Sequence, residues 1–387
     1  MVQKVLIIDD SKTVHSVVKS KLSDEPIEFH SGFTGRAGLE LAAALQPDLI
    51  LLDVELPDLN GFEVCRLLKA DPKTMIIPVI FLTGASTTEE KIKGLRLGAV
   101  DYVTKPFDVA ELLARVGASL RTKFLIDLLA AQHAATRALS ESETLAEATP
   151  RIVKAICESL DWDLGIIWEV DQQTAMLTLV SAWHSHRVQA PEFKEVTSQT
   201  RLGRGVGLPG IVWEKAKPNW IPDVLKEPNF HRDRFTAKTG LHGAIAFPLQ
   251  SSKEVVGVIE FLNRQVEEVD NDLLNMLCAI GSQIGQFAER KRAEKVQAAT
   301  YRAAEAANAA PGLEDLFRLT HTIVADLMPA KNFYVALYER DSGVLSFRYF
   351  IDEYDPTPAP RKLKNGLTEY VLRTGKPLLH HQQCSRG

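Results

Sequence analysis

The chain has 387 residues, of which 45% are hydrophobic, so it is long enough to bury the cores of about two or three domains. Its 45 lysines and arginines and 50 aspartates and glutamates give a formal net charge of −5, and the lack of a basic excess argues against a nucleic-acid partner. No apolar run reaches the ~18 residues that a membrane span needs, and four widely separated cysteines argue against a disulfide framework or a zinc site, so we expect a cytoplasmic protein.

Charged side chains follow three short apolar runs in the first 110 residues. Asp9 and Asp10 follow residues 5–8, Asp53 follows residues 49–52, and Lys105 with Pro106 follows residues 100–104. Such continuous apolar runs are typical of parallel strands that are buried on both faces. Ligands bind at the carboxyl ends of the strands in sheets of this kind, so we expect the three acids and the lysine to meet at one edge.

This mixture of charges suits phosphoryl transfer. Mg²⁺ is held by one or two carboxylates together with phosphate oxygens, so Asp9 and Asp10 are the expected metal ligands, together with Asp53 and Glu55. Asp53 is the expected nucleophile, because a carboxylate can accept a phosphoryl group as an acyl phosphate. Lys105 would supply a positive charge to that group. The alternative for Asp10 is a helix cap, but a cap requires neither Asp53 nor Lys105.

The remainder of this segment alternates strands and helices. Helical spacing of apolar residues follows Ser11 and Asp108, and further helices are predicted over residues 37–45, 61–70 and 88–97. Residues 27–29 and 79–82 are predicted strands, and Thr83 directly follows the second of them. The pattern predicts an α/β domain with five strands and five helices.

Residues 1–122 resemble the receiver domain of bacterial response regulators. The resemblance is carried, in order and at the expected spacing, by residues 4–10, 47–53, 56–63, 78–83 and 98–107. It implies a flavodoxin-like, doubly wound parallel sheet and Mg²⁺-dependent phosphorylation of Asp53 by a partner histidine kinase. It also implies a cis Lys105-Pro106 peptide bond and a coupled movement of Thr83 and Tyr102 on phosphorylation.

A connecting helix is predicted over residues 123–141, because neither Gly nor Pro occurs between Phe124 and Pro150. Counted from Phe124, its apolar positions follow a 4,3,4,3 spacing, at Leu128, Ala131, Ala135 and Ala138. This thin seam fits a parallel helix pair in a homodimer, packing within the chain, or a solvated helix. His133 in the same stretch is expected to lie on the surface.

Residues 142–290 resemble the GAF domain, an α+β sensory fold. The resemblance is carried by residues 203–210, 220–223, 240–248 and 256–261 and by a closing helix with apolar positions from Leu273 to Phe287. It implies dimerisation and signal relay, with a small-molecule ligand in some members. No ligand is identified here, and we expect the closing helix to contribute to a homodimer.

An internal repeat links this segment to the end of the chain. Gly207-Leu208, Val212 and Lys217-Pro218 recur with the same spacing as Gly366-Leu367, Val371 and Lys376-Pro377. Residues 291–311 are predicted to be a helical linker, and residues 312–387 an incomplete second GAF copy with an unpaired sheet edge. Two functions fit this arrangement. One is a phosphorylatable signalling relay without a catalytic output, and the other is the regulatory front of a hybrid histidine kinase or diguanylate cyclase whose catalytic domain is absent.

Overall fold

The computed structural model describes residues 3–22, 26–84, 88–171, 174–188, 200–227, 240–252, 254–266 and 269–378. These residues form two compact units, Met1–Ala288 and Glu289–Gly387. Among the helices that the structure describes, none is both long enough and apolar enough to cross a membrane.

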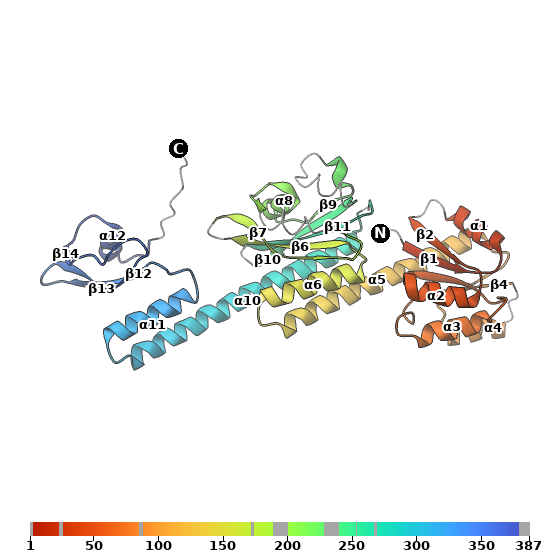
Figure 1. Cartoon of the computed structure of the whole chain (residues 1–387), viewed down its shortest axis with the longest axis horizontal. Coiled ribbons are helices and arrows are strands. Elements are labelled where there is room, and N and C mark those ends of the chain that lie inside the picture. The colour runs from red at the N-terminus through yellow and green to blue at the C-terminus, as the bar shows by residue number, and fades with distance from the viewer. Residues whose placement is uncertain are drawn as a thin grey trace. The chain divides into compact units, whose positions relative to one another are not determined.

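The first domain is built on a parallel five-stranded sheet (Figure 1). Its strands lie in the order β2-β1-β3-β4-β5, and their bounds are β1 Gln3–Ile8, β2 Ile27–Gly32, β3 Leu49–Asp53, β4 Val79–Thr83 and β5 Asp101–Thr104. Residues of β3 and β4 are buried throughout, as the continuous apolar runs predict. The predicted doubly wound α/β fold is therefore confirmed.

Helices cover both faces of this sheet. Their bounds are α1 Lys12–Lys21, α2 Gly35–Leu45, α3 Gly61–Ala70, α4 Thr88–Arg96 and the start of α5 at Val109. One apolar cluster joins α1 and α5 to one face, and a second joins α2 and α3 to the other. All five predicted helices are present, and the bounds predicted for α3 agree with the structure.

The second domain contains a six-stranded antiparallel sheet in the order β8-β7-β6-β11-β10-β9. Its elements are α6 Leu145–Ser159, β6 Leu164–Asp171, β7 Met176–His184, β8 Arg201–Leu202, α8 Gly207–Lys215, β9 Asn219–Ile221, the 3-10 turn η1 Val224–Lys226, β10 Gly243–Gln250 and β11 Val255–Asn263. The sequence pattern predicts strand pairs over residues 164–170 and 176–183 and over residues 243–249 and 255–262, and both pairs are present, while β8, β9 and α8 are not predicted as elements.

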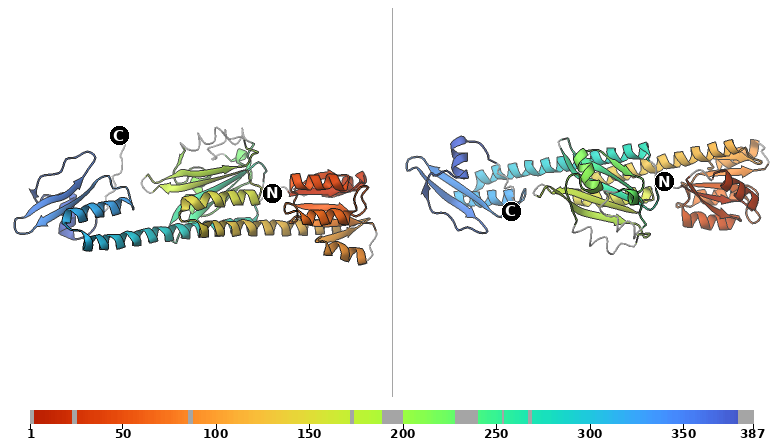
Figure 2. Two further views of the ribbon diagram at one scale, coloured as in Figure 1. Left: turned by 60° about the horizontal axis from the view of Figure 1, so that its bottom comes forward. Right: turned by 90° about the horizontal axis from the view of Figure 1, so that it is seen from above.

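Three helices pack on one face of this sheet (Figure 2). They are α6, the second half of α5 (Val109–Glu141) and the first half of α10 (Asn271–Ala309). The predicted seam residues of α5 belong to this core, and each is at most 5% exposed: Leu128, Ala131, Ala135 and Ala138. The apolar positions of α10 from Leu273 to Phe287 lie in the same core. These side chains are therefore covered by the chain's own helices and sheet, which for α5 is the packing within the chain that the sequence left open, and the expected homodimer stays a prediction.

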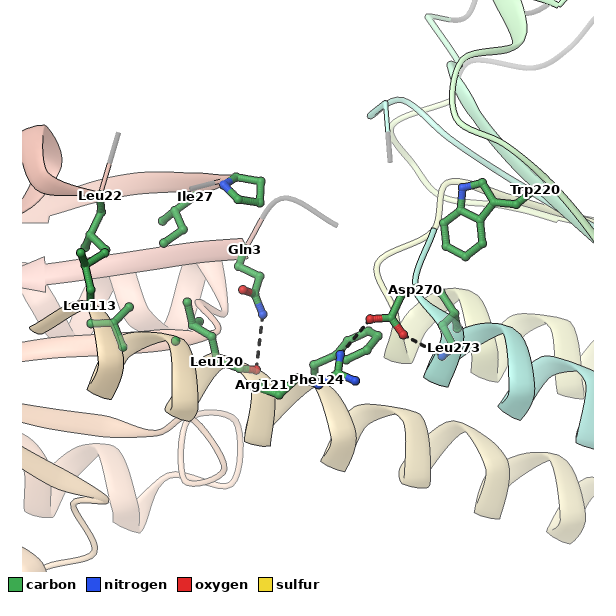
Figure 3. A pocket seen from close by; sticks show the side chains of 13 residues that line it. Gln3, Leu22, Ile27, Leu113, Leu120, Arg121, Phe124, Trp220, Asp270 and Leu273 are labelled. Atoms are coloured by element: carbon green, nitrogen blue, oxygen red, sulfur yellow. Dashed lines mark hydrogen bonds and ion pairs between the residues drawn. The ribbon is translucent and has the colours of Figure 1, made fainter. Parts of the chain in front are cut away.

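The first and second domains also meet beside residues 113–124 of α5 (Figure 3). Arg121 pairs with Asp270 at 2.8 Å and also with Asp272, while Lys4 lies 3.0 Å from the carboxylate of Asp161. A cavity of about 400 Å³ lies beside the Arg121 pair, with Phe124 and Trp220 in its wall. Ion pairs thus accompany the helix that joins the two domains.

The second unit follows the order of elements in the second domain. Its elements are α11 Leu313–Ala325, β12 Phe333–Glu339, β13 Val344–Ile351, β14 Arg361–Lys362 and α12 Leu367–Thr374. The sheet order β12-β13-β14 corresponds to β6-β7-β8, with α12 in the place of α8. Strand β6 pairs with β11 on its other side. Among the residues that the structure describes, β12 has no such neighbour, which agrees with the predicted unpaired edge.

Candidate functional site

Three carboxylates meet at the carboxyl edge of the parallel sheet. Asp9 and Asp10 follow β1, Asp53 ends β3, and one oxygen from each of the three lies within 4.8 Å of the others. Asp9 and Asp53 are buried, whereas Asp10 is exposed. Strands β1 and β3 are neighbours in the sheet, so residues about 44 positions apart are brought together by strand pairing.

Lys105 bridges two of these acids. Its Nζ lies 2.6 Å from Oδ2 of Asp9 and 2.9 Å from Oδ2 of Asp53. The position of the lysine is set by β5, and its backbone N–H donates to the carbonyl of Thr83 at 2.6 Å. The following Lys105-Pro106 peptide bond is cis, as the resemblance implies.

Burial shapes the electrostatics of this cluster. Loss of solvent raises the pKa of Asp53 above its usual value, and the charge of Asp9 adds to this, while the hydrogen bond and charge of Lys105 oppose it. For Lys105, burial lowers the pKa, but the hydrogen bonds to Asp9 and Asp53 together with the negative charges of these two groups outweigh burial and raise it. Three carboxylates with a single ammonium group thus leave excess negative charge. Oxygen ligands in this number fit a hard divalent cation such as Mg²⁺.

The backbone around the acids is closely fitted. Oδ1 of Asp9 accepts the N–H of Ser11 at 2.9 Å, and the N–H of Asp9 donates to the carbonyl of Gly32 at 3.1 Å. A Cβ at Gly61 would overlap the carbonyl oxygen of Asp53, so only glycine fits where α3 begins. The orientation of the acids is therefore fixed by main-chain contacts as well as by the sheet.

The other predicted site residues take different positions. Glu55 is exposed and its carboxylate is not part of the three-acid group, but its backbone N–H lies 3.4 Å from Oδ1 of Asp53. Thr83 ends β4 and is buried, one residue beyond Leu82, which pairs with Asp53 in the sheet. Tyr102 on β5 lines a small cavity together with Thr83, and Nζ of Lys91 lies 4.3 Å from its ring centre.

Two family models match the chain. The response regulator receiver domain model matches residues 5–117, and the GAF domain model matches residues 142–288. The chain carries a receiver domain followed by a GAF domain. Both matches fall within the segments predicted from the sequence, and the three acids lie inside the matched receiver domain.

Curated relatives match part of the chain. RpaA of Synechocystis sp., a DNA-binding dual master transcriptional regulator, is 46% identical over 118 residues, which are 30% of this chain and 49% of that protein. The response regulator PleD of Caulobacter vibrioides is 40% identical over 137 residues, covering 35% of this chain and 30% of that protein. The response regulator ArlR of Staphylococcus saprophyticus is 41% identical over 128 residues, covering 32% and 57%. The chain thus spans between 30% and 57% of the length of these relatives.

Sequence reasoning missed several supporting residues of the receiver domain. Ser11 and His15 bind atoms of Asp9, and the carboxylate of Asp58 accepts the backbone N–H groups of Gly35 and Arg36 at the start of α2. His15 had a signal in the sequence, because it shares the buried face of α1 with Val18, and Leu22 directly after the helix continues that spacing. The contacts of Ser11 and Asp58 depend on loop conformation, which the residue pattern alone does not specify.

The GAF domain has one buried acid on the sheet face opposite its three helices. Glu260 on β11 is 0% exposed, and Nε1 of Trp168 donates to it at 3.2 Å. The neighbouring side chains on this face are apolar, among them Val258 and Leu262. Glu260 therefore has a partner within the domain and is part of its packed interior.

Proposed function

We propose that the receiver domain accepts a phosphoryl group on Asp53 from a partner histidine kinase, with Mg²⁺ held by Asp9, Asp10 and Asp53. The observation that carries this proposal is the group of three carboxylates within 4.8 Å, two of which Lys105 bridges. A structural ion pair would need one acid for one lysine. The two further carboxylates here are an excess that a divalent cation would balance.

In the transfer step, an oxygen of the Asp53 carboxylate attacks phosphorus as the bond to the donor's imidazole nitrogen breaks. The product is an acyl phosphate on Asp53 and a free imidazole on the kinase. Bound Mg²⁺ supplies positive charge that offsets the phosphoryl oxygens. Lys105 then exchanges its contact with Asp53 for one with a phosphoryl oxygen, while its contact with Asp9 keeps the ammonium group in place.

Thr83 and Tyr102 are proposed to change position together when Asp53 is phosphorylated. Thr83 is buried one residue beyond the sheet partner of Asp53, and its hydroxyl is suited to bind a phosphoryl oxygen. Because Thr83 and Tyr102 line the same small cavity, a shift of the threonine changes the space available to the tyrosine ring. The carbonyl of Thr83 also accepts the N–H of Lys105, which ties this residue to the lysine.

The connecting helix is proposed to relay the change to the GAF domain. Helix α5 is continuous from Val109 to Glu141, and it packs on the receiver sheet through residues such as Leu112 and Val116. Further along, Leu128 and Ala135 lie in the GAF core. A movement of the helix against the receiver sheet would therefore act directly on that core.

Dimerisation is the output that we propose for this relay. The predicted seam is buried within the chain, so a homodimer through the connecting helix would use another side. Exposed apolar side chains on α5 are Leu125, Ile126 and Leu129. We further propose that residues 312–387 hold a partial second GAF copy, on the support of the matching order of elements.

The test of the acceptor is labelling by radioactive acetyl phosphate in the presence of Mg²⁺. The wild type is expected to be labelled, with label lost when EDTA removes the metal, and Asp53→Asn is expected to take up none. Asp71→Asn is the matched control, because Asp71 is an exposed aspartate at the far end of α3. Labelling of Asp53→Asn at the wild-type level would refute Asp53 as the acceptor.

A further inference from the structure

A buried histidine lies directly behind the acidic site. His15 on α1 is 4% exposed, and both of its ring nitrogens have partners. Nε2 lies 2.8 Å from the backbone carbonyl oxygen of Asp9, and Nδ1 lies 2.9 Å from Oγ of Ser31 on β2. The ring also contacts Phe33, with 4.6 Å between ring centres. One side chain thus joins the first helix, the end of β1 and β2.

The hydrogen bond from His15 satisfies the backbone carbonyl of Asp9. The pairing of β1 with β2 and with β3 ends at Ile8, so the carbonyl of Asp9 lies beyond both ladders. A buried carbonyl needs a donor. Since a carbonyl oxygen only accepts, Nε2 of His15 carries the hydrogen and donates it. The hydroxyl of Ser31 is then suited to donate to Nδ1.

The carbonyl of Asp9 is part of the main chain that connects two of the three acids. It belongs to the peptide group that joins Asp9 to Asp10, and a peptide group is planar and moves as one body. Rotation of that plane would change the directions of the chain at both aspartates, and with them the positions of both carboxylates. The hydrogen bond from His15 therefore acts on two of the three acids without touching either carboxylate.

We propose that His15 is a positioning residue that sets the Asp9–Asp10 peptide plane, and so the geometry of the cation site. This inference rests on the proposed function only in taking Asp9 and Asp10 as cation ligands. His15 contacts neither the phosphoryl group nor the cation. Ser31 supports it from the other side of the ring, and Phe33 limits the tilt of the ring.

The test is the Mg²⁺ dependence of four variants of the full chain. His15→Phe keeps a flat ring and removes the donor, whereas His15→Gln keeps an N–H donor at the position of Nε2. Ser31→Ala removes the partner of Nδ1. His133→Phe is the matched control, since His133 is an exposed histidine on α5. For each, Mg²⁺ affinity is measured by calorimetry, and the rate of labelling by acetyl phosphate is measured against Mg²⁺ concentration.

His15→Phe is expected to weaken Mg²⁺ binding about tenfold, as loss of a residue that orients metal ligands does. The half-saturating Mg²⁺ concentration for labelling should rise by the same factor, with most of the maximal rate recovered at saturating Mg²⁺. His15→Gln should restore most of the affinity, Ser31→Ala should show a smaller loss, and His133→Phe should match the wild type. A merely structural role would lower the melting temperature in EDTA without moving the half-saturating concentration.

Wild-type Mg²⁺ affinity in folded His15→Phe would overturn the inference. Should that variant fail to fold, as judged by circular dichroism, Ser31→Ala decides, and its unchanged affinity would overturn the inference equally. Failure of the proposed function gives a different result. In that case the wild type binds Mg²⁺ in the calorimeter but takes up no label at Asp53, and the calorimetric comparison of the variants still tests His15.

Discussion

Replacing Ala135 with leucine distinguishes packing within the chain from packing between two chains. Ala135 lies on α5 with a 0% exposed side chain, inside the core that α5, α6 and α10 share with the GAF sheet. Leucine adds three carbon atoms to a space that is already filled. Overpacking of this kind costs ~1–3 kcal/mol. A seam between two chains would respond in the opposite direction, because extra buried carbons there stabilise by ~0.8 kcal/mol each.

The assay is urea denaturation followed by tryptophan fluorescence. All five tryptophans lie in residues 142–290, so the signal reports unfolding of the GAF domain: Trp162, Trp168, Trp183, Trp213 and Trp220. We expect Ala135→Leu to lower the free energy of unfolding by ~2 kcal/mol. Ala130→Leu is the control, since Ala130 is exposed on the same helix, and its effect should stay within ~0.5 kcal/mol.

The refuting result is a stabilised Ala135→Leu protein whose melting temperature rises with protein concentration. Only a folded state of two or more chains gives that dependence. The leucine would then lie between chains, and the arrangement of the three helices on the GAF sheet would be wrong.

Two further predictions concern charged groups of the receiver domain. Lys105→Met should raise the pKa of Asp53 further in Mg²⁺-free buffer, because in the wild type the hydrogen bond and charge of Lys105 lower that pKa. A carbon-13 NMR titration measures the pKa, and an unchanged value would contradict this prediction. Asp48→Asn should stabilise the receiver domain at pH 7, because burial raises the pKa of Asp48 in the folded state and its ionisation therefore opposes folding. Above the unfolded-state pKa of 3.8, the folded wild type binds more protons than its unfolded chain, so its stability falls as pH rises. The stability advantage of Asp48→Asn should therefore be large at pH 7 and shrink as pH falls toward 3.8. Urea denaturation followed by circular dichroism at pH 7 and pH 4 measures this, and a variant less stable than the wild type at pH 7 would contradict it.

The receiver strands were predictable because their apolar runs are continuous and end in charged residues. The meeting of Asp9 with Asp53 follows from that pattern, since parallel strands present their carboxyl ends at one edge. The spacing of Leu128 to Ala138 was less informative. Periodicity identifies the apolar side of a helix, but it does not say which surface covers that side. Packing within the chain, which the sequence left open, is what the structure shows.

Other features depend on tertiary contacts that no local pattern specifies. Glu55 is a predicted metal ligand through its carboxylate, yet the contact that the structure gives it with Asp53 is through its backbone N–H. Strands β8 and β9 have two and three residues and were too short for an alternation of apolar and polar side chains to be visible. The spacing of α1 indicates that His15 is buried, but its two hydrogen-bond partners depend on tertiary contacts.

The sharing of α5 between the two cores bears on how this protein can be divided into fragments. A fragment that starts at residue 142, where the GAF model begins, would lose Leu128, Ala131, Ala135, Ala138 and Leu139 from its interior. The sheet face under α6 and α10 would then meet water along the strip that α5 occupies. A GAF fragment that keeps its hydrophobic interior must therefore begin near Phe124, inside the helix that also closes the receiver domain.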